Sequence, residues 1–345
     1  MAAREDGPNK TFCNPGWEET EQMRTACSVI ASAIALYVGS IDCHAEPYPT
    51  RSIKIVVPAT PGGAIDVIAR LLADKLTVSM GQPVVTENKP GASNNLGTDF
   101  VAKSPPDGYN LVIVASSHAT NKFLFKQMPF DPVADFEPVV FTHIVPLVLA
   151  VHPGVPAKTV AELIAWIKAN PDKASFASSG KGSSLHMAAE LFKSMAGIPT
   201  MLHVPYRGSS AAHPDLLGGR TAMIFDTITA ILPHIQSGGV RALAVTTLKR
   251  SAALPDVPTI AEGALPGYDA NTWGGILAPA GTPKEIVLRL NAEINKALAT
   301  EEVRTKLTAN GIDIQGGTPA KFGDYIKAEV VKWAKVTKDA GIQPE

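Results

Sequence analysis

The chain has 345 residues, 45% of them hydrophobic, and a formal net charge of −1 at pH 7. This length is more than one hydrophobic core comfortably serves and suits two domains. The near-neutral charge gives no sign of a nucleic-acid partner. The cysteines, Cys13, Cys27 and Cys43, all lie near the N-terminus, so the remainder of the sequence can form neither a disulfide nor a cysteine metal site.

The first 45 residues resemble a leader with a signal peptide. An apolar stretch at about 26–39 follows Met23 and Arg24. The later segment Cys43-His44-Ala45 has small residues at the two positions that a signal peptidase recognises. We expect translation to start at Met23, cleavage to follow Ala45 and the mature protein to be periplasmic. The stretch is shorter than the roughly 20 apolar residues of a membrane span, so we expect no membrane insertion of the mature chain. The alternative is a disordered tail on a cytoplasmic protein.

A strand-like run at 53–57 leads through a Pro-Gly-Gly turn into a helix-like run at 69–76. Such a turn leaves the first N–H groups of the helix without partners, and its glycines let a ligand approach the backbone closely. We therefore predict an anion-binding site here; the alternative is an ordinary tight connection. The residues of this site are Pro61, Gly62, Gly63, Ile65 and Asp66.

Strand and helix patterns alternate along the rest of the chain. Strands are expected at 84–88, 111–115 and 221–225, and helices at 160–169, 184–196, 284–299 and 321–338. This alternation predicts an α/β fold of mostly parallel sheets covered by helices. The segments at 145–151 and 263–273 are candidate crossings between domains. We expect domain 1 at 46–150 plus 271–345 and domain 2 at 151–270, which allows hinge closure over a cleft.

Four further places put polar groups after a strand, where an open α/β sheet binds its ligand. A turn at 116–121 either binds a ligand or caps a short helix. A segment at 178–186, rich in Gly and Ser, opens a helix at about Ser184 and forms a second anion-binding site. Two later strand ends include Asp226, which either accepts a hydrogen bond from a ligand or caps the next helix. The candidate ligand-binding residues in these places are Ser116, Ser117, His118, Asn121, Ser179, Gly180, Gly182, Ser183, Ser184, His186, Tyr206, Gly208 and Asp226.

An enzyme is the main alternative, because Ser183 or Ser184 with His186 and Asp226 supplies the residue types of a nucleophilic triad. The sequence has no Gly-x-Ser-x-Gly motif, and the three-residue step from Ser183 to His186 does not direct the imidazole at the hydroxyl. It also has no His-Glu-x-x-His motif or other cluster of metal ligands. We expect no catalytic residue, no metal site and no cofactor, with a periplasmic serine hydrolase as the alternative.

Seven short motifs occur in a fixed order. They are Pro-Gly-Gly-x-x-Asp at 61–66, Glu-Asn-Lys-Pro-Gly-Ala at 87–92, Pro-Asp-Gly-Tyr at 106–109, Ser-Gly-x-Gly-Ser-Ser-x-His at 179–186, Val-Pro-Tyr-Arg-Gly at 204–208, Ala-Leu-Ala-Val-Thr at 242–246 and Leu-Pro-Asp-Val-Pro-Thr at 254–259. Together they resemble the Bug family, the periplasmic solute receptors of tripartite tricarboxylate transporters, over residues 49–345. One departure is Ala59-Thr60, where family members commonly carry Phe.

The resemblance implies a two-domain periplasmic binding protein, type II-like, with a mostly parallel sheet flanked by helices in each domain and the ligand cleft between them. It implies that both Gly-rich loops hold a small organic carboxylate: a di- or tricarboxylate, an acidic amino acid or an aromatic acid. The receptor would deliver this ligand to the membrane permease subunits of the transporter. We expect a monomer that is not an enzyme; a receptor feeding a sensor kinase is a further alternative.

Overall fold

The computed structural model describes residues 48–344 except Gly63 and Pro199. The predicted leader, with its start at Met23 and cleavage after Ala45, lies outside the described residues. The strands are β1 Ile53–Val57, β2 Val84–Asn88, β3 Asn110–Ala115, β4 Phe136–Val151, β5 Ser175–Ser178, β6 Leu202–Pro205, β7 Met223–Thr227, β8 Arg241–Val245, β9 Asn271–Pro279 and β10 Asp313–Ile314. The α-helices are α2 Ala64–Met80, α3 Asn95–Ala102, α4 Ser117–Thr120, α5 Val160–Ala169, α6 Ser184–Ala196, α7 Ser209–Leu217, α8 Ile228–Gln236, α9 Ile260–Gly263, α10 Lys284–Ala299, α11 Glu301–Thr308 and α12 Pro319–Asp339. Short 3₁₀ turns occur at η2 Ala92–Asn94 and η3 Asn121–Phe123.

The described strands form one hydrogen-bonded path, β2-β1-β3-β9-β4-β7-β5-β6, and both β8 and β10 pair with β4. Parallel pairs join β1 to β2 and β3, and β5 to β6 and β7. Every antiparallel pair within the described ranges involves β4 or β9. The α/β fold is therefore as predicted, and the parallel arrangement is confined to these two groups of strands, which antiparallel strands connect.

The long strand β4 pairs first with one group of strands and then with the other. It runs beside β9 from Phe136 to Pro146 and beside β7 from Leu147 to Val151. The partner of Pro146 is Asn271, the first residue of β9. Both predicted crossings thus meet at one point of the fold, while the division of the chain into two domains at 150 and 271 stays a prediction.

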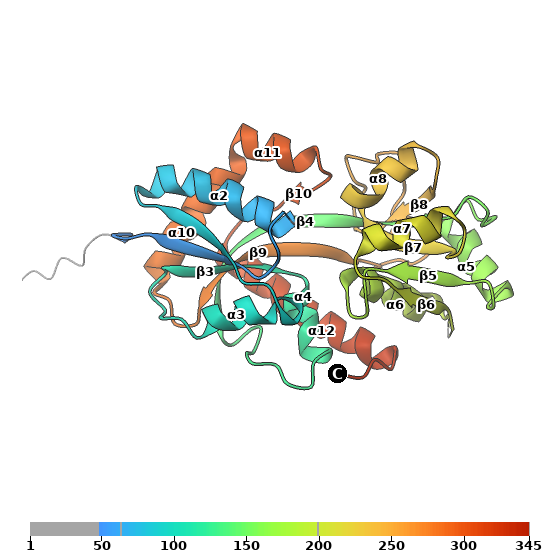
Figure 1. Ribbon diagram of the computed structural model, residues 1–345, viewed down its shortest axis with the longest axis horizontal. Helices are drawn as coiled ribbons and strands as arrows, with labels where there is room; N and C mark the ends of the chain where they lie inside the picture. The colour runs from blue at the N-terminus through green and yellow to red at the C-terminus, as the bar shows by residue number, and fades with distance from the viewer. Residues whose placement is uncertain (1–47, 63, 199, 345) are drawn as a thin grey trace, which may run out of the picture. The chain divides into compact units, whose positions relative to one another are not determined.

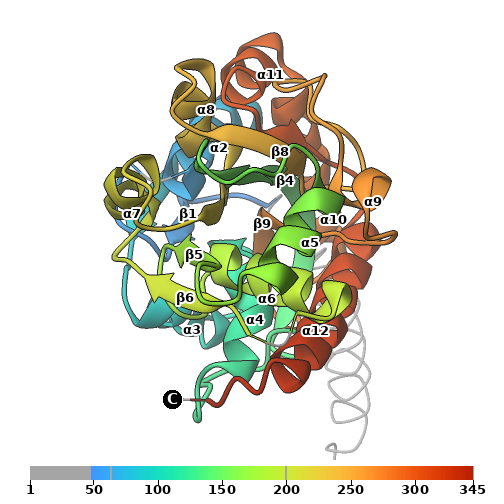
Figure 2. The ribbon, with the colours of Figure 1, turned by 90° about the vertical axis from the view of Figure 1, so that its right-hand side faces the viewer.

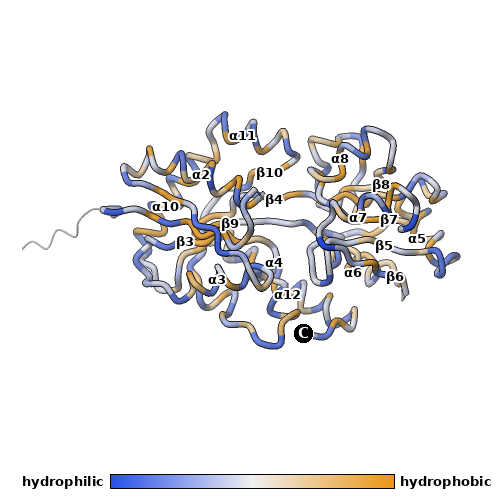
Figure 3. Tube along the Cα trace, in the orientation of Figure 1, coloured by the Kyte–Doolittle hydropathy of each residue, from blue (hydrophilic) through white to orange (hydrophobic). Residues whose placement is uncertain are grey.

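The core has two parts because the central strands are buried on both faces. In β1, Ile55 and Val57 belong to one buried cluster and Val56 to the other. In β4, Leu149 and Ala150 divide between the two clusters in the same way. This alternation is what the two-residue period of a strand produces. Figure 3 shows apolar colour along these strand segments and polar colour at many of the turns.

Helices cover both faces of the strands. Figure 1 shows α2 and α10 on one side of β3 and α3 on the other, and Figure 2 shows α6 and α7 on opposite sides of β5. In α2, Ile68, Leu72 and Leu76 recur at the spacing of one helix face and are fully or almost fully buried. Within the described ranges no helix has the length and apolar character needed to span a bilayer.

Candidate functional site

The second loop, residues 179–184, connects β5 to α6. Ser183 is the N-cap of α6, and its Oγ accepts the N–H of His186 at 3.3 Å. The helix begins at Ser184, which confirms the predicted start. The first N–H groups of a helix have no partner inside it, so those of Ser184 and Leu185 have no hydrogen-bond partner among the described residues.

His186 supports the second loop from inside the fold. Its side chain lies in the first turn of α6 and is buried. Its Nδ1 accepts the N–H of Gly182 at 3.0 Å, and its Nε2 lies 3.6 Å from Oε1 of Glu190. Because a backbone N–H can only donate, this contact assigns the acceptor role to Nδ1. A protein group therefore already occupies the Nδ1 nitrogen.

A cavity of about 310 Å³ lies beside the second loop. The predicted site residues that line it are Ser117, Asn121, Ser179, Gly182 and Ser183. The lining residues that the sequence analysis does not predict are Ser93, Asn94, Leu124, Phe125, Lys181 and Gln343. The cavity thus combines the second loop with the 91–95 segment, the turn after β3 and the C-terminal residues.

The 91–95 segment has a backbone conformation that residues other than glycine rarely adopt. Its three consecutive residues at positive φ are Ala92, Ser93 and Asn94, at 46°, 51° and 77°. Asn121 Nδ2 donates to the Ser93 carbonyl at 2.7 Å, and Asn94 Nδ2 donates to Ser117 Oγ at 2.9 Å. Strained backbone of this kind clusters at functional sites, which supports a binding role for this wall of the cavity.

The first loop, residues 61–66, is held by its own aspartate. Asp66 is 2% exposed, and its carboxylate accepts the N–H of Gly62 at 2.9 Å, two hydrogen bonds from Arg70 at 3.0 Å and one from Asn88 at 2.9 Å. The hydrogen bonds from Arg70, with those from Gly62 and Asn88, outweigh burial and lower the pKa of Asp66 to about 2. Protein donors thus occupy the acceptor positions of this carboxylate, and Asp66 fixes the loop rather than offering itself to a ligand.

Two predicted site residues belong to the core. Ile65 packs among buried residues at the start of α2. His118 is 3% exposed, its Nε2 lies 2.8 Å from the Pro132 carbonyl, and its ring lies beside Phe130 and Phe136. Burial lowers the pKa of His118 to about 4. Its aromatic neighbours hold His118 in the interior, and a role for it in ligand binding stays a prediction.

Three more predicted residues lie apart from the 310 Å³ cavity or outside the description. Ser116 is buried, with its Oγ 3.2 Å from Oγ1 of Thr272 in β9. Pro61 is exposed at the turn before α2. Gly63 is outside the described residues.

Asp226 also has a different environment from the predicted one. It is fully buried, and its Oδ2 lies 2.6 Å from Nε2 of His213 in α7. Its Oδ1 accepts the N–H of Thr227 at 2.7 Å, just before α8. In this arrangement His213 and the Thr227 N–H occupy the Asp226 carboxylate, and a ligand contact at Asp226 stays a prediction.

The strand end after β6 connects to the second loop through its backbone. The N–H of Gly208, at φ 97°, donates to the Ser179 carbonyl at 3.3 Å. Tyr206 donates its hydroxyl to Asp215 at 2.7 Å. Burial and this acidic neighbour raise the pKa of Tyr206 to about 12. Gly208 thus steadies the second loop, and the Tyr206 hydroxyl is directed to Asp215.

The residue types of a nucleophilic triad do not form one. Ser183 donates to a backbone carbonyl, His186 accepts a backbone N–H, and Asp226 pairs with His213. This geometry gives no support to hydrolysis by Ser183. In the part of the chain that the structure describes, no group of three or more His, Cys, Asp or Glu side chains could hold a metal ion.

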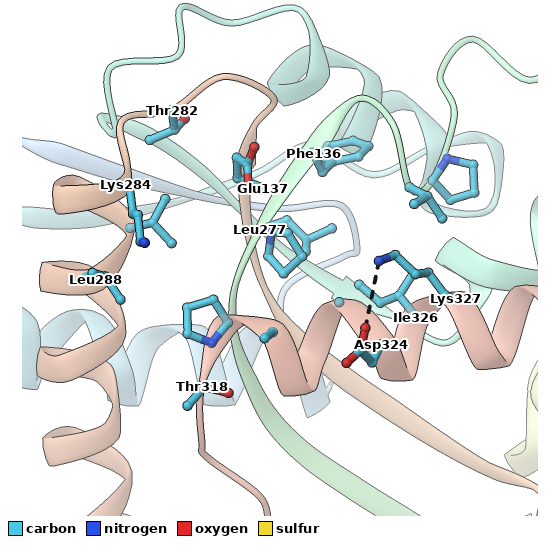
Figure 4. Close-up of a pocket in the computed structure, with 17 residues that line it drawn as sticks. Phe136, Glu137, Leu277, Thr282, Lys284, Leu288, Thr318, Asp324, Ile326 and Lys327 are labelled. Carbon is cyan, nitrogen blue, oxygen red and sulfur yellow. Dashed lines mark ion pairs between the residues drawn. The ribbon is translucent and has the colours of Figure 1, made fainter.

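A larger cavity, of about 790 Å³, contains none of the predicted site residues. Figure 4 shows it near the starts of β4, α10 and α12, with Phe136, Leu277 and Ile326 among its apolar walls. Asp324 and Lys327 form an ion pair at 3.8 Å beside it. Its apolar lining distinguishes it from the polar cavity at the second loop.

A family model and curated relatives identify the family of the chain. The model of the family described as "Tripartite tricarboxylate transporter family receptor" matches residues 68–342. Protein BugT of Bordetella pertussis is 39% identical over 321 residues, which are 92% of this chain and 98% of that protein.

Solved structures extend this similarity to the fold. A protein from R. palustris with adipate has a TM-score of 0.74 and 40% identity, covering 86% of this chain and 100% of that one. The periplasmic binding protein BugD has a TM-score of 0.71 and 34% identity, with coverage of 86% and 100%. MatC from Rhodopseudomonas palustris with bound malate has a TM-score of 0.68 and 30% identity, with coverage of 84% and 99%. The chain is therefore a periplasmic solute receptor that belongs to the tripartite tricarboxylate transporter receptor family, as its resemblance to the Bug proteins predicts.

Proposed function

We propose that the protein binds a small organic carboxylate at the second loop and delivers it to the permease subunits of a tripartite tricarboxylate transporter. The observation that carries this proposal is the N-terminus of α6, where the N–H groups of Ser184 and Leu185 have no partner among the described residues. These groups follow directly on Ser179, Lys181, Gly182 and Ser183 of the second loop, which line a cavity of about 310 Å³. The first loop, which leads into the N-terminus of α2, is the second anion-binding element of the proposal.

The physical basis is the affinity of helix N-termini for anions. Unpaired N–H groups and the positive end of the helix dipole both favour negative charge, and α6 has 13 residues, or more than three turns. The Ser183 hydroxyl already donates to the Gly180 carbonyl, and the Gly182 N–H already donates to His186 of α6. A bound carboxylate would therefore rely mainly on backbone donors, which recognise the carboxylate group without selecting the rest of the acid.

The volume of the cavity favours a small ligand. Ligand sites commonly measure about 300–1,000 Å³, so this cavity of about 310 Å³ lies at the small end of that range. The Ser117 hydroxyl accepts from Asn94 and keeps its own hydrogen to donate to a polar acid. Leu124 and Phe125 offer apolar contact to a short carbon chain.

The similar proteins support the same class of ligand. One neighbour at 40% identity was solved with adipate and another at 30% identity with malate, both dicarboxylates. The family description supports delivery to a tripartite transporter. Adipate and malate are accordingly the first ligands to test on this chain.

Thermal shift tests the binding proposal. The panel contains adipate, malate, citrate, glutamate and benzoate, with the uncharged diamide of adipic acid as a matched control. A ligand at about 100 times its dissociation constant stabilises the fold by roughly 2.7 kcal/mol, which is a rise in Tm of several degrees. We expect a rise with at least one acid and none with the diamide. The proposal fails if no acid raises Tm, or if the diamide acts as well as adipate.

Delivery needs its own experiment, because binding alone does not establish it. Uptake of the acid that binds is measured in cells with and without the permease genes. We expect uptake to need both the receptor and the permease. Uptake that persists without the permease would contradict delivery while leaving the binding result intact.

A further inference from the structure

Beneath the second loop, two histidine rings and a phenylalanine ring lie in a stack. The ring centroids of His186 and His203 are 4.1 Å apart, and those of His203 and Phe176 are 4.7 Å apart, with planes within 14° and 10° of parallel. His186 comes from α6, His203 from β6 and Phe176 from β5. The stack thus joins three elements at the base of the loop.

One chain of contacts runs from the stack to Gly182. The Gly182 N–H donates to Nδ1 of His186 at 3.0 Å. On the other side of the ring, Nε2 lies 3.6 Å from Glu190, which accepts from Lys193 at 2.8 Å and 2.9 Å. The carboxylate favours a proton on Nε2, which leaves Nδ1 as the acceptor that Gly182 requires.

A second chain runs from the stack to Gly180. Nε2 of His203 lies 2.7 Å from Oγ of Ser178, a fully buried residue. The same Oγ accepts the Gly180 N–H at 3.1 Å and lies 3.1 Å from the Gly180 carbonyl oxygen. A hydroxyl can donate once and accept twice, so donation to the carbonyl leaves the lone pairs of Ser178 for Gly180 N–H and His203.

We propose that His186 and His203 are positioning residues for the second loop: they hold Gly182 and Gly180 in the conformation in which the N-terminus of α6 is open to a carboxylate. Gly180 and Gly182 have φ of 126° and 75°, a backbone region in which a loop needs support to stay ordered. Neither ring is assigned to touch the ligand. This inference rests on the proposed function only for its effect on affinity, since the effect on the loop itself is independent of any ligand.

The two histidines use different ring nitrogens, which gives a matched set of variants. An asparagine amide reaches about as far as Nδ1 of a histidine, and a glutamine amide about as far as Nε2. His186→Asn and His203→Gln should therefore preserve the contacts to Gly182 and Ser178. His186→Gln and His203→Asn remove the same imidazoles but place the amide wrongly. A loss of stacking or of bulk is common to both variants at each position.

Amide hydrogen exchange of Gly180 and Gly182, followed by NMR without ligand, is the first readout. We expect His186→Gln to speed exchange at Gly182 and His203→Asn to speed it at Gly180, while His186→Asn and His203→Gln remain close to the wild type. Equal exchange in the two variants of each pair would overturn the inference, whether or not a ligand is known.

The second readout is the affinity for adipate and malate by calorimetry. A half-buried N–H without its partner lowers the population of the binding-competent loop, so His186→Gln and His203→Asn should bind on the order of tenfold more weakly. The preserving variants should bind like the wild type. Equal affinities within each pair would contradict the inference. A wild type that binds neither acid, with the exchange result as expected, would count against the proposed ligand class and leave the loop assignment standing.

Discussion

Gly182 of the second loop and Leu124 of the turn after β3 are packed so closely that a Cβ atom on Gly182 would displace the Leu124 side chain. A Cβ atom on Gly182 would lie 2.6 Å from Cδ1 of Leu124, and both residues line the cavity of about 310 Å³. The φ of Gly182, 75°, also disfavours any residue with a side chain. The cavity wall therefore depends on this glycine for two separate reasons.

We expect Gly182→Ala to weaken carboxylate binding. Leu124 must leave its preferred rotamer, at a cost of about 0.5–1.5 kcal/mol, which is roughly a two- to tenfold loss of affinity. The second substitution Leu124→Ala should remove the clash, so a double-mutant cycle by calorimetry should give a non-zero coupling energy.

Gly238→Ala is the matched control for Gly182→Ala. Gly238 has φ 73° but nothing within 4 Å of an added Cβ. Like Gly182→Ala, the Gly238→Ala variant should lose roughly 1–2 kcal/mol of stability, because both place a side chain on a left-handed backbone. Gly238→Ala should keep the affinity of the wild type. If Gly182→Ala binds as well as Gly238→Ala, Leu124 does not constrain the second loop.

The ionised Asp66 carboxylate should contribute to the free energy of unfolding, and this contribution should be lost at acidic pH. Its pKa is lowered to about 2 from the usual value of about 4, so its contribution is fully present above about pH 4 and lost as pH falls toward 2. Asp66→Asn cannot titrate, and the free energy of unfolding of this variant should fall less over that interval. Urea unfolding at a series of pH values measures the difference.

Asp131→Asn is the control that distinguishes the effect of pH on stability from an effect on ligand binding. Its pKa is also lowered to about 2, chiefly by the hydrogen bond from Lys122. Asp131→Asn should therefore show the same pH signature as Asp66→Asn. Only Asp66→Asn should weaken carboxylate binding, because only Asp66 accepts the N–H of Gly62 in the first loop. Unchanged affinity in Asp66→Asn would remove the first loop from the proposed site.

For Asp226 the structure predicts a loss of stability rather than of binding. Asp226→Ala leaves His213 without its carboxylate partner in the interior, which costs about 1–3 kcal/mol. The free energy of unfolding should fall by that amount, and the dissociation constant of the folded protein should stay unchanged. A larger dissociation constant at an unchanged free energy of unfolding would support the prediction that Asp226 contacts the ligand.

Local pattern was sufficient to predict many elements of the fold. Helices α5, α6 and α10 have the predicted bounds, 160–169, 184–196 and 284–299. Their apolar spacing and the N-cap Thr159 of α5 or Ser183 of α6 are properties of a short stretch of sequence. Strand β7 lies two residues later than predicted, because its ladder with β4 begins at Met223, and such pairing depends on a distant strand.

The sequence predicts the local conformation of the second loop, because the turn before the helix determines it. It does not predict which candidate side chains are enclosed by residues far away in the sequence. Ser183 and Gly182 follow from the turn before α6, whereas His118 and Asp226 face inward because Phe130 and His213 fill their surroundings. The sequence analysis did not predict the 91–95 segment as part of the site, because three consecutive residues with left-handed backbone are exceptional unless hydrogen bonds from distant residues hold them. That support includes Asn121, 28 positions beyond Ser93, and the only local signal is a Gly- and Asn-containing turn after a strand.

The N-terminus of α6 permits a direct test of whether a backbone N–H holds the ligand. Ser184 is the first residue of α6, a position that accepts proline because its N–H has no partner in the helix. The preceding residue, Ser183, has φ −64° and ψ 158°, which suits a residue before proline. Ser184→Pro should thus leave the fold intact and remove one donor. A hydrogen bond to a charged group contributes about 1.5–3 kcal/mol, so the affinity for adipate or malate should fall roughly ten- to a hundredfold.

Two controls make the Ser184→Pro result specific. Glu301→Pro makes the same change at the start of α11, after Thr300 at φ −64° and ψ 143°, and should change neither fold nor affinity. Ser184→Ala removes the hydroxyl but keeps the N–H, and should bind nearly as well as the wild type. Calorimetry and thermal unfolding of all three variants decide the point. If Ser184→Pro binds like the wild type, the carboxylate does not lie at this helix terminus; if Ser184→Ala loses as much affinity as Ser184→Pro, the hydroxyl and not the backbone N–H is the donor.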